Sequence, residues 1–456
     1  EDMEYSEFLK NKESKFIAAG FDIDKSELNE NLFEYQKDVV RWALKKGRAA
    51  LFEDCGLGKT LQQLEWSNQV YKYTKGNVLI LCPLAVAKQT AREGEKFGIK
   101  VTICRSQEDV QKGINITNYD KLHKFDTDDF TGIVLDESSI LKSFTGKVRN
   151  EIIESFKYTP YKLSCTATPS PNDYMELGNQ SEFLGVLNRS EMLSTFFIHD
   201  GGDTSKWRLK GHAVEKFWKW VSSWAVMIDN PKNIGYDMKF ELPDLNIQDI
   251  IVKTHEKQDT LIPTVATSLN ERREARKNSM PERMAAAKNI ISKNPGEQFL
   301  IWCDFNYESE SLKKELNGIE VKGSDTNEEK ENRMMEFSDS TINLLITKPS
   351  IAGFGMNWQQ CHNMIFFGLS DSFEQFYQAV RRCWRFGQKE VVNVYVVIGE
   401  REISVLQNIK RKKADLKNMQ QEMLKYSKDI LKPAAATERM SKKYIPVENL
   451  KLPAWI

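Results

Sequence analysis

Residues 53–60, with the sequence EDCGLGKT, combine the residue types that bind the phosphates of a nucleotide. Gly56 and Gly58 allow the backbone to turn tightly, so that successive N–H groups point toward phosphate oxygens. We expect Lys59 to reach the β- and γ-phosphates and the Thr60 hydroxyl to bind Mg²⁺. The segment therefore predicts a site for ATP and Mg²⁺.

The neighbouring sequence decides between this interpretation and a chance match in a loop. The usual pattern GxxxxGK[ST] begins with a glycine where this chain has Glu53, so a strict pattern would miss the segment. However, it follows a strand-like stretch at 49–52 and precedes a helix-like stretch at 61–74, whose N-terminal end would attract the same anion. This strand–turn–helix setting favours a phosphate loop of the Walker A kind.

A second group of candidate residues is an apolar stretch at 133–137 that ends in two acids. Asp136 is suited to bind Mg²⁺ through water, and Glu137 to polarise the attacking water. Acids at strand ends are often only solvated turn residues, but a preceding phosphate loop favours the catalytic interpretation. Gln36 is a candidate to read the adenine edge, although a single glutamine on a helix is commonly a surface residue.

Short apolar segments alternate with amphipathic ones along most of the chain, which predicts parallel sheets covered by helices on both faces. The first series of expected strands is 49–52, 78–82, 100–104, 114–117, 132–135 and 161–166. The second series is 247–253, 298–303, 318–322, 343–347, 363–367 and 391–398. Expected helices include 61–74, 86–97, 307–316 and 373–385. The fold class is therefore α/β, with two lobes in tandem.

Three regions depart from the alternation. An aromatic-rich insertion at about 175–230 is expected to form a small accessory core, with base stacking or strand separation as the alternative. A basic helical segment at about 264–293 is either a nucleic-acid contact or a solvated helix face. The expected organisation is an N-terminal extension 1–30, lobe 1 at 31–245, lobe 2 at 246–400 and a basic helical tail at 401–456.

Composition narrows the class of protein without deciding its function. The chain has 456 residues, 40% hydrophobic and 29% charged, which is a globular profile with room for two or three domains. Its zero net charge excludes a bulk polycation of the histone kind. The 7 cysteines lack zinc-binding spacing, no apolar run approaches the roughly 18 residues of a membrane span, and the first residues lack a signal-peptide core. We expect a cytoplasmic protein without a membrane partner.

With these elements in order, the chain resembles superfamily 2 helicases, and within them the Swi/Snf-type DNA translocases, over about residues 32–398. Residues 53–60 are similar to the DEMGLGKT loop of that group, which also lacks the first glycine. The other similar segments are 81–85 (motif Ia), 117–122 (Ib), 135–139 (the DEAH-box position), 166–169 (III), 299–305 (IV), 352–357 (V) and 378–388 (VI). Blocks such as TATPSPNDYMELG look like the subgroup encoded by phages and prophages, which would place the protein in a bacterial host cytoplasm.

The resemblance implies two RecA-like lobes with ATP between them. It places Arg382 and Arg385 opposite the γ-phosphate, with Arg385 as the arginine finger, whereas we expect Arg381 to be a solvated charge. It adds Gly355 and Gln378 to the ATP site. It also assigns Thr166 and Thr168 to the coupling between ATP state and lobe closure.

The resemblance further implies DNA, whether duplex, forked or single-stranded, as the partner, contacted mostly through its phosphates. The segment 347–351 does not align cleanly with motif V, so the hydroxyl contact stays open between Thr347 and Ser350. The candidate contact residues are Pro83, Lys88, Asn118, Lys147, Phe305, Asn306, Thr347, Ser350, Arg272 and Arg273.

The preferred function is an ATP-dependent DNA translocase or helicase, acting as a monomer, in replication or recombination and together with proteins of those processes. An RNA helicase is the nearest alternative, but the GLGKT and RFGQK forms argue against it. A catalytically silent nucleotide-binding scaffold is the third alternative. Against it stand the catalytic candidates Lys59, Asp136, Glu137, Arg382 and Arg385.

Overall fold

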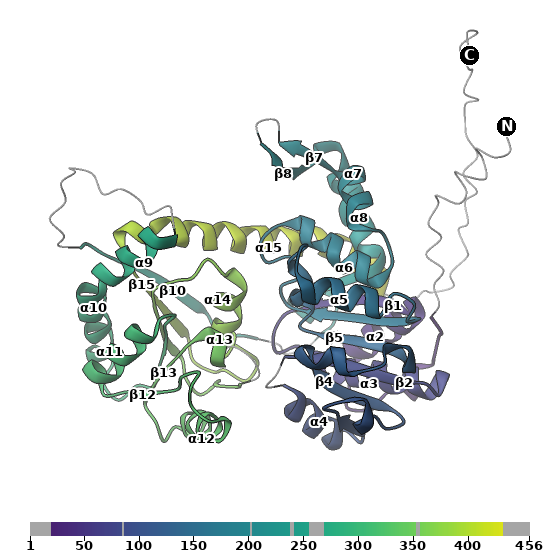
Figure 1. The fold of residues 1–456 in the computed structure, drawn as a ribbon, viewed down its shortest axis with the longest axis horizontal. Coiled ribbons are helices and arrows are strands. Elements are labelled where there is room, and N and C mark those ends of the chain that lie inside the picture. Colours follow the sequence, from purple (N-terminus) through teal and green to yellow (C-terminus); the bar gives the residue numbers. More distant parts are fainter. Residues whose placement is uncertain are drawn as a thin grey trace, which may run out of the picture.

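The structure is a computed structural model that describes residues 20–83, 86–200, 203–237, 241–254, 269–352 and 356–431. Gly355, most of the expected N-terminal extension and the end of the expected tail lie outside the described residues. Two α/β lobes stand side by side, and one long helix crosses from the second lobe to the first (Figure 1). The predicted fold class is confirmed. The expected domain boundaries stay predictions.

Lobe 1 is built on a parallel seven-stranded sheet with the order β3-β4-β2-β5-β6-β1-β9. Its strands are β1 (Arg48–Glu53), β2 (Asn77–Cys82), β3 (Val101–Ile103), β4 (Ile114–Asn118), β5 (Phe130–Asp136), β6 (Tyr161–Thr166) and β9 (Ala225–Ile228). Its helices are α2 (Glu34–Lys46), α3 (Lys59–Thr74), α4 (Ala87–Lys96), α5 (Lys147–Ser155), α6 (Leu177–Leu184), α7 (Arg189–Phe196) and α8 (Val214–Trp224). Each strand expected for this lobe is present within a few residues.

Alternation along β1 explains why both faces of this sheet are covered. Ala49 and Leu51 pack into the apolar cluster that contains α2 and α3, whereas Ala50 and Phe52 pack into the cluster that contains α6 and α8. Successive side chains of a strand point to opposite faces, so a strand buried on both faces needs apolar residues throughout.

Lobe 2 has a parallel six-stranded sheet with the order β10-β15-β14-β11-β13-β12. Its strands are β10 (Leu245–Val252), β11 (Phe299–Trp302), β12 (Ile319–Glu320), β13 (Leu344–Thr347), β14 (Asn363–Phe367) and β15 (Val392–Gly399). Its helices are α9 (Leu269–Asn278), α10 (Met280–Ser292), α11 (Asn306–Leu316), α12 (Asn327–Ser338), α13 (Pro349–Ala352) and α14 (Phe373–Val380). The helix expected over 373–385 ends earlier, at Val380, and irregular turns follow it.

The aromatic-rich region forms a packed core that supports a protruding hairpin. Phe217 packs edge-to-face against Phe196 and Trp218, with ring centroids 5.5 and 4.9 Å apart. The antiparallel strands β7 (Phe197–Asp200) and β8 (Asp203–Leu209) project from this core (Figure 1). The region ends in β9, which pairs with β1 of the main sheet, so its last residues belong to the framework of lobe 1.

The segment expected as a basic tail begins with α15 (Ile403–Leu431), a helix of 29 residues that joins the lobes. Its first turns pack on lobe 2, and the later ones pack on α8 and β9 of lobe 1. In lobe 1 the Tyr174 hydroxyl donates to the Asp415 carbonyl at 2.9 Å, and Met423 is fully buried. This helix is therefore partly a core element, although it is rich in lysine. No helix among the described residues combines the length and apolar character needed to cross a membrane.

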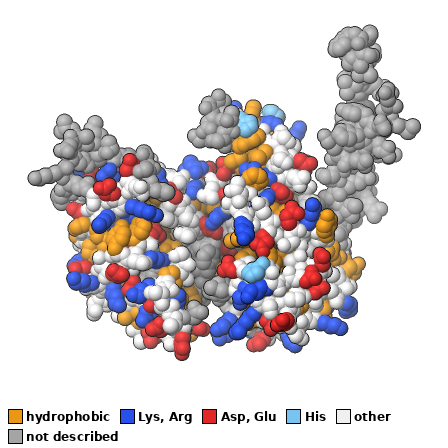
Figure 2. All heavy atoms as spheres, viewed as in Figure 1, with side chains coloured by type: hydrophobic (Ala, Val, Ile, Leu, Met, Phe, Trp, Pro, Cys, Tyr) orange, Lys and Arg blue, Asp and Glu red, His pale blue; other side chains and the backbone are white. Residues whose placement is uncertain are grey.

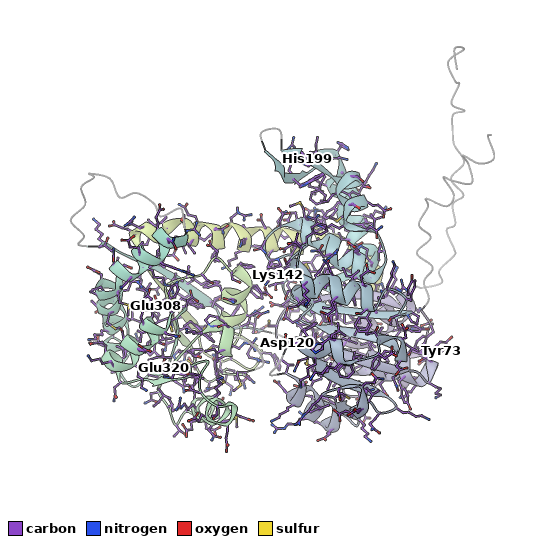
Figure 3. The ribbon with its side chains drawn as sticks, in the orientation of Figure 1. Tyr73, Asp120, Lys142, His199, Glu308 and Glu320 are labelled. Carbon is purple, nitrogen blue, oxygen red and sulfur yellow. The ribbon has the colours of Figure 1, made fainter. Side chains whose placement is uncertain are left out.

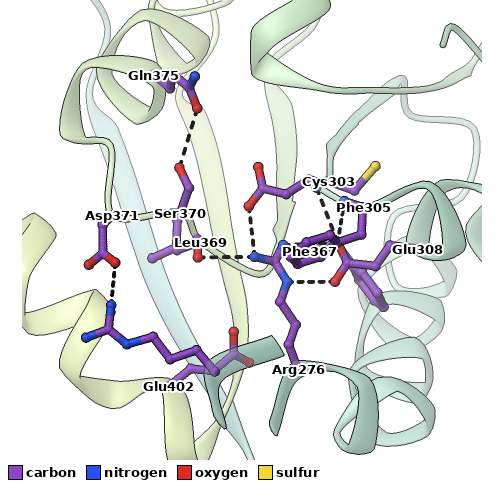
Figure 4. Close-up of polar contacts among 12 residues, drawn as sticks. Arg276, Cys303, Phe305, Glu308, Phe367, Leu369, Ser370, Asp371, Gln375 and Glu402 are labelled. Carbon is purple, nitrogen blue, oxygen red and sulfur yellow. Dashed lines mark hydrogen bonds and ion pairs between the residues drawn. The ribbon is translucent and has the colours of Figure 1, made fainter. Parts of the chain in front are cut away.

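The basic segment of lobe 2 also differs from the expected surface patch. Arg276 and Arg283 are buried, and both pair with Glu308 of α11, which has no exposed surface. Figure 4 shows the pair between Arg276 and Glu308. Both guanidinium groups also donate to the Phe367 carbonyl, at 3.0 and 3.1 Å. Burial alone would raise the pKa of Glu308, but the two arginines outweigh it and hold that pKa below its usual value. These two arginines of the basic segment thus form an internal ion-pair network, because buried charges require partners.

We predict that Glu308→Gln destabilises lobe 2 by about 3–5 kcal/mol, because it removes the ion-pair partner of the buried Arg283 and leaves the buried Arg276 with Asp304 alone. Urea unfolding followed by tryptophan fluorescence measures the change. Glu315→Gln is the matched control on the same helix, since Glu315 forms only an exposed pair with Lys288 and its loss should not shift the curve. Equal unfolding midpoints for the two variants would contradict the prediction.

Candidate active site in the cleft between the lobes

The phosphate loop connects β1 to α3 at the carboxyl edge of the lobe 1 sheet. Gly56 and Gly58 have φ angles of 87° and 74°, a conformation that glycine adopts without strain. Helix α3 begins at Lys59, so its free N–H groups face the loop. The Lys59 ammonium donates to the carbonyls of Glu53 and Asp54 at 2.7 and 3.1 Å, and Thr60 is half-buried beside it. The local geometry fits a phosphate cradle.

Glu53, the departure from the usual pattern, is a fully buried residue of β1. Its carboxylate accepts from the Gln62 amide at 2.7 Å, and one carboxylate oxygen has no partner among the described residues. Burial raises the pKa of Glu53 to about 7, against the opposing effect of Lys59. The side chain ties the start of the loop to α3, a role that the sequence did not suggest.

Gln36 lies under the loop. Its amide donates to the Leu57 carbonyl at 2.9 Å and its oxygen accepts from the Phe33 N–H at 2.9 Å. The Tyr35 hydroxyl donates to the same Leu57 carbonyl at 2.6 Å. These bonds support the loop directly, and the reading of adenine by Gln36 stays a prediction.

The two candidate acids at the end of β5 lie beside the loop. Asp136 accepts from the Gln63 amide at 2.9 Å, and burial raises its pKa. Glu137 has a φ angle of 65°, accepts a hydrogen bond from the Thr166 hydroxyl and lies 3.0 Å from the hydroxyl oxygen of Ser139. Burial, and then the charge of Glu374, raise the pKa of Glu137 to about 7. A carboxyl group so poised has the character of a general base.

The candidate coupling residues continue this network. The Thr168 N–H donates to the Thr166 hydroxyl at 3.0 Å, and the Thr168 hydroxyl is buried without a partner among the described residues. The end of β6 is therefore joined to Glu137 through Thr166. Strand β6, which lies between β1 and β5 in the sheet, thus supports Glu137.

Lobe 2 closes the cleft with the turns that follow α14. Arg382 and Arg385 both donate to the Met356 carbonyl, at 3.1 and 3.3 Å. Burial lowers the pKa of Arg382 to about 10 and also lowers that of Arg385. A Cβ atom placed on Gly56 would lie 3.9 Å from the Cβ of Arg385, so these arginines stand against the phosphate loop. The Gln378 amide is buried close by, and neither of its polar atoms has a partner among the described residues.

Arg381 overturns the expectation of a solvated charge. It is 3% exposed and forms an ion pair with Asp54 of the phosphate loop, which also accepts from the Tyr377 hydroxyl. The partner comes from the other lobe, more than 300 residues earlier, so helical spacing gave no signal of it. Asp54 is therefore a contact between the lobes that the sequence did not reveal.

The candidate nucleic-acid residues are scattered over both lobes. Lys88 and Lys147 are exposed and Pro83 is half-buried, whereas Asn118 is buried at the end of β4. Lys147 lines an open cavity of about 700 Å³ with His123, Thr145 and Asn150. Figure 2 shows Lys and Arg side chains on both lobes, interspersed with Asp and Glu side chains.

In lobe 2 the structure separates the open alternatives of motif V. Thr347 has no exposed surface and its hydroxyl donates to the Val321 carbonyl at 3.1 Å, whereas Ser350 is exposed. Ser350 is therefore the more accessible of the two, and a contact of either residue with nucleic acid stays a prediction.

The other lobe 2 candidates differ in how far they are engaged within the protein. Phe305 stacks on Tyr307 and contacts Arg276, and Asn306 accepts from Lys348 at 2.5 Å. Arg272 pairs with Asp371, and Arg273 is exposed.

Comparisons with known proteins match a different domain in each lobe. Residues 35–196 match the SNF2-related domain, and residues 282–387 match the helicase conserved C-terminal domain. The chain is 22% identical over 525 residues to the TATA-binding protein-associated factor mot1 of Schizosaccharomyces pombe. This match covers 85% of this chain and 26% of that protein. It is also 22% identical over 420 residues to a SWI/SNF-related regulator of chromatin, subfamily A-like protein 1, of Xenopus laevis, covering 82% of this chain and 42% of that protein.

The chain thus spans less than half the length of these two relatives. Among solved structures, the SWI2/SNF2 ATPase core of Sulfolobus solfataricus in complex with double-stranded DNA is 19% identical, with a TM-score of 0.42, over 90% of this chain and 96% of that one. The chain thus matches an SNF2-related domain in lobe 1 and a helicase conserved C-terminal domain in lobe 2.

Proposed function

We propose that this protein hydrolyses ATP in the cleft between its lobes and uses the reaction to move along DNA. The observation that supports this most directly is the approach of Arg382 and Arg385 of lobe 2 to the phosphate loop of lobe 1. A site that both lobes complete can hydrolyse ATP only when the lobes are closed. Hydrolysis and lobe movement are thereby linked.

The chain's own residues divide the work of hydrolysis. Lys59 and the N–H groups of the loop hold the phosphates, and Thr60 with Asp136 would hold Mg²⁺, which supplies charge stabilisation when bound. Glu137 accepts the proton of the attacking water. Arg385 stabilises the charge that develops on the transferring phosphoryl group, and Arg382 supports it.

We infer DNA as the partner from the match of lobe 1 to the SNF2-related domain and from the exposed cations Lys88 and Lys147 of the same lobe. From the sequence resemblance we further propose that the protein acts in replication or recombination. We also propose that it is located in a bacterial host cytoplasm and belongs to the phage-encoded subgroup.

We predict that Arg385→Ala lowers kcat for ATP by about a thousand-fold, because the transition state loses its cation from lobe 2. Lys59→Ala should reduce turnover to background. Lys389→Ala is the matched control, since Lys389 is exposed a few residues further on, and it should keep wild-type turnover. Steady-state phosphate release measures all three. Wild-type turnover by Arg385→Ala would exclude the finger assignment.

We predict that duplex or forked DNA raises ATP turnover above the rate without nucleic acid and more than RNA does. The same assay with single-stranded, duplex and forked DNA and with RNA measures the preference. Raising the salt concentration should weaken the stimulation steeply, because phosphate contacts release counterions. Equal turnover with every substrate would contradict a DNA motor, and a greater effect of RNA would favour the RNA helicase.

A further inference from the structure

The Ser139 hydroxyl lies between two carboxylates that belong to different lobes. Its oxygen is 3.0 Å from the carboxylate of Glu137 and 2.5 Å from that of Glu374. Ser139 is 1% exposed and Glu374 is 6% exposed, so water does not separate the three groups freely. Ser139 belongs to η5 (Ser138–Lys142) of lobe 1, which directly follows the candidate acids, and Glu374 lies in the first turn of α14 of lobe 2.

A serine hydroxyl has one proton and can donate it to one carboxylate at a time. The shorter contact assigns the proton to Glu374 in this arrangement of the lobes. Glu137 then keeps the hydrogen bond from Thr166 and has a further lone pair available.

The position of Glu374 depends on the lobes being together. Its carboxylate also pairs with Lys142 of lobe 1, which lies at the side of that lobe facing lobe 2 (Figure 3). When α14 moves away, Glu374 leaves with it, whereas Glu137 stays two residues from Ser139 in the chain. The partner of the hydroxyl therefore changes with lobe closure.

We propose that Ser139 is a positioning residue that reports lobe closure to the active site, because closure transfers its hydrogen bond from Glu137 to Glu374. With the lobes apart, the hydroxyl occupies a lone pair of Glu137 that the attacking water needs. With the lobes together, Glu374 takes the hydroxyl and Glu137 is free to accept the proton of water. The inference rests on the proposed ATP hydrolysis and deepens it by naming Glu374 as the group that releases Glu137.

The decisive experiment compares Glu374→Ala with the double variant Glu374→Ala/Ser139→Ala. Glu374→Ala should lower kcat for ATP about ten-fold without changing KM, because Ser139 then stays on Glu137 when the lobes close, and a hydrogen bond to a charged group has about that effect. Adding Ser139→Ala removes the obstructing hydroxyl. The double variant should therefore recover to within about three-fold of wild type.

Two further variants separate this device from general damage to the interface. Glu374→Gln keeps an acceptor oxygen for Ser139 and loses only the pair with the half-exposed Lys142, so it should retain nearly wild-type kcat. Ser138 is the matched control, because its buried hydroxyl has no partner among the described residues. Adding Ser138→Ala to Glu374→Ala should rescue nothing.

The outcomes distinguish the inference from the proposed function. If the double variant is as slow as Glu374→Ala, or slower, Glu374 only holds the lobes together and the transfer of the hydroxyl is wrong. If DNA fails to stimulate the wild type, the DNA motor is wrong, and the same rescue is judged on basal turnover. If the wild type is no faster than Lys59→Ala, the ATPase assignment and the inference fall together. Thermal melting of each variant confirms that it is folded.

Discussion

The close approach of lobe 2 to the phosphate loop is the constraint on which the rest of the site depends. A Cβ atom on Gly56 would lie 3.3 Å from the backbone nitrogen of Phe386, and the φ angle of Gly56 already disfavours any side chain. Glycine is thus required twice, for the turn of the loop and for the contact between lobes. Without that contact the arginines after α14 would stand away from the residues that bind phosphate. The two parallel sheets serve to bring these two turns together.

Burial of charge is the second theme of the cleft. Burial raises the pKa of Glu53, Asp136 and Glu137 and lowers that of Arg382 and Arg385. The same exclusion of water strengthens every electrostatic interaction made there, so a highly charged substrate gains most from it. Hydrogen bonds from Gln62, Gln63 and Thr166 hold the acids in place meanwhile. Burying these charged groups therefore costs free energy when no ligand is bound. The resulting environment is well matched to phosphate chemistry.

The sequence predicted the sheets well because buried parallel strands are continuous apolar segments bounded by turns. It did not predict which charged side chains are buried or which acids they pair with. Arg381 and Arg276 look alike on the sequence, as cations on helices, yet each is buried against an acid from a distant segment. Such partners depend on tertiary packing, which periodicity does not record. The glycines and Lys59 of the loop were easier to predict from the sequence, because the local strand–turn–helix order determines their geometry. The chemical roles assigned to the site residues stay predictions.

Helix α15 makes the two lobes mechanically dependent on one another. Lys412 donates at 2.8 Å to Asn172 of lobe 1 and to the Asp371 carbonyl of lobe 2, so this one side chain is shared by both. A helix of 29 residues is a rod of about 43 Å that neither stretches nor shortens appreciably. The chain also passes between the lobes once before, ahead of β10. Two lobes that pack on the same rigid helix can move apart only by breaking the contacts of one of them with that helix. Opening of the cleft and rearrangement at α15 are thereby tied to one another.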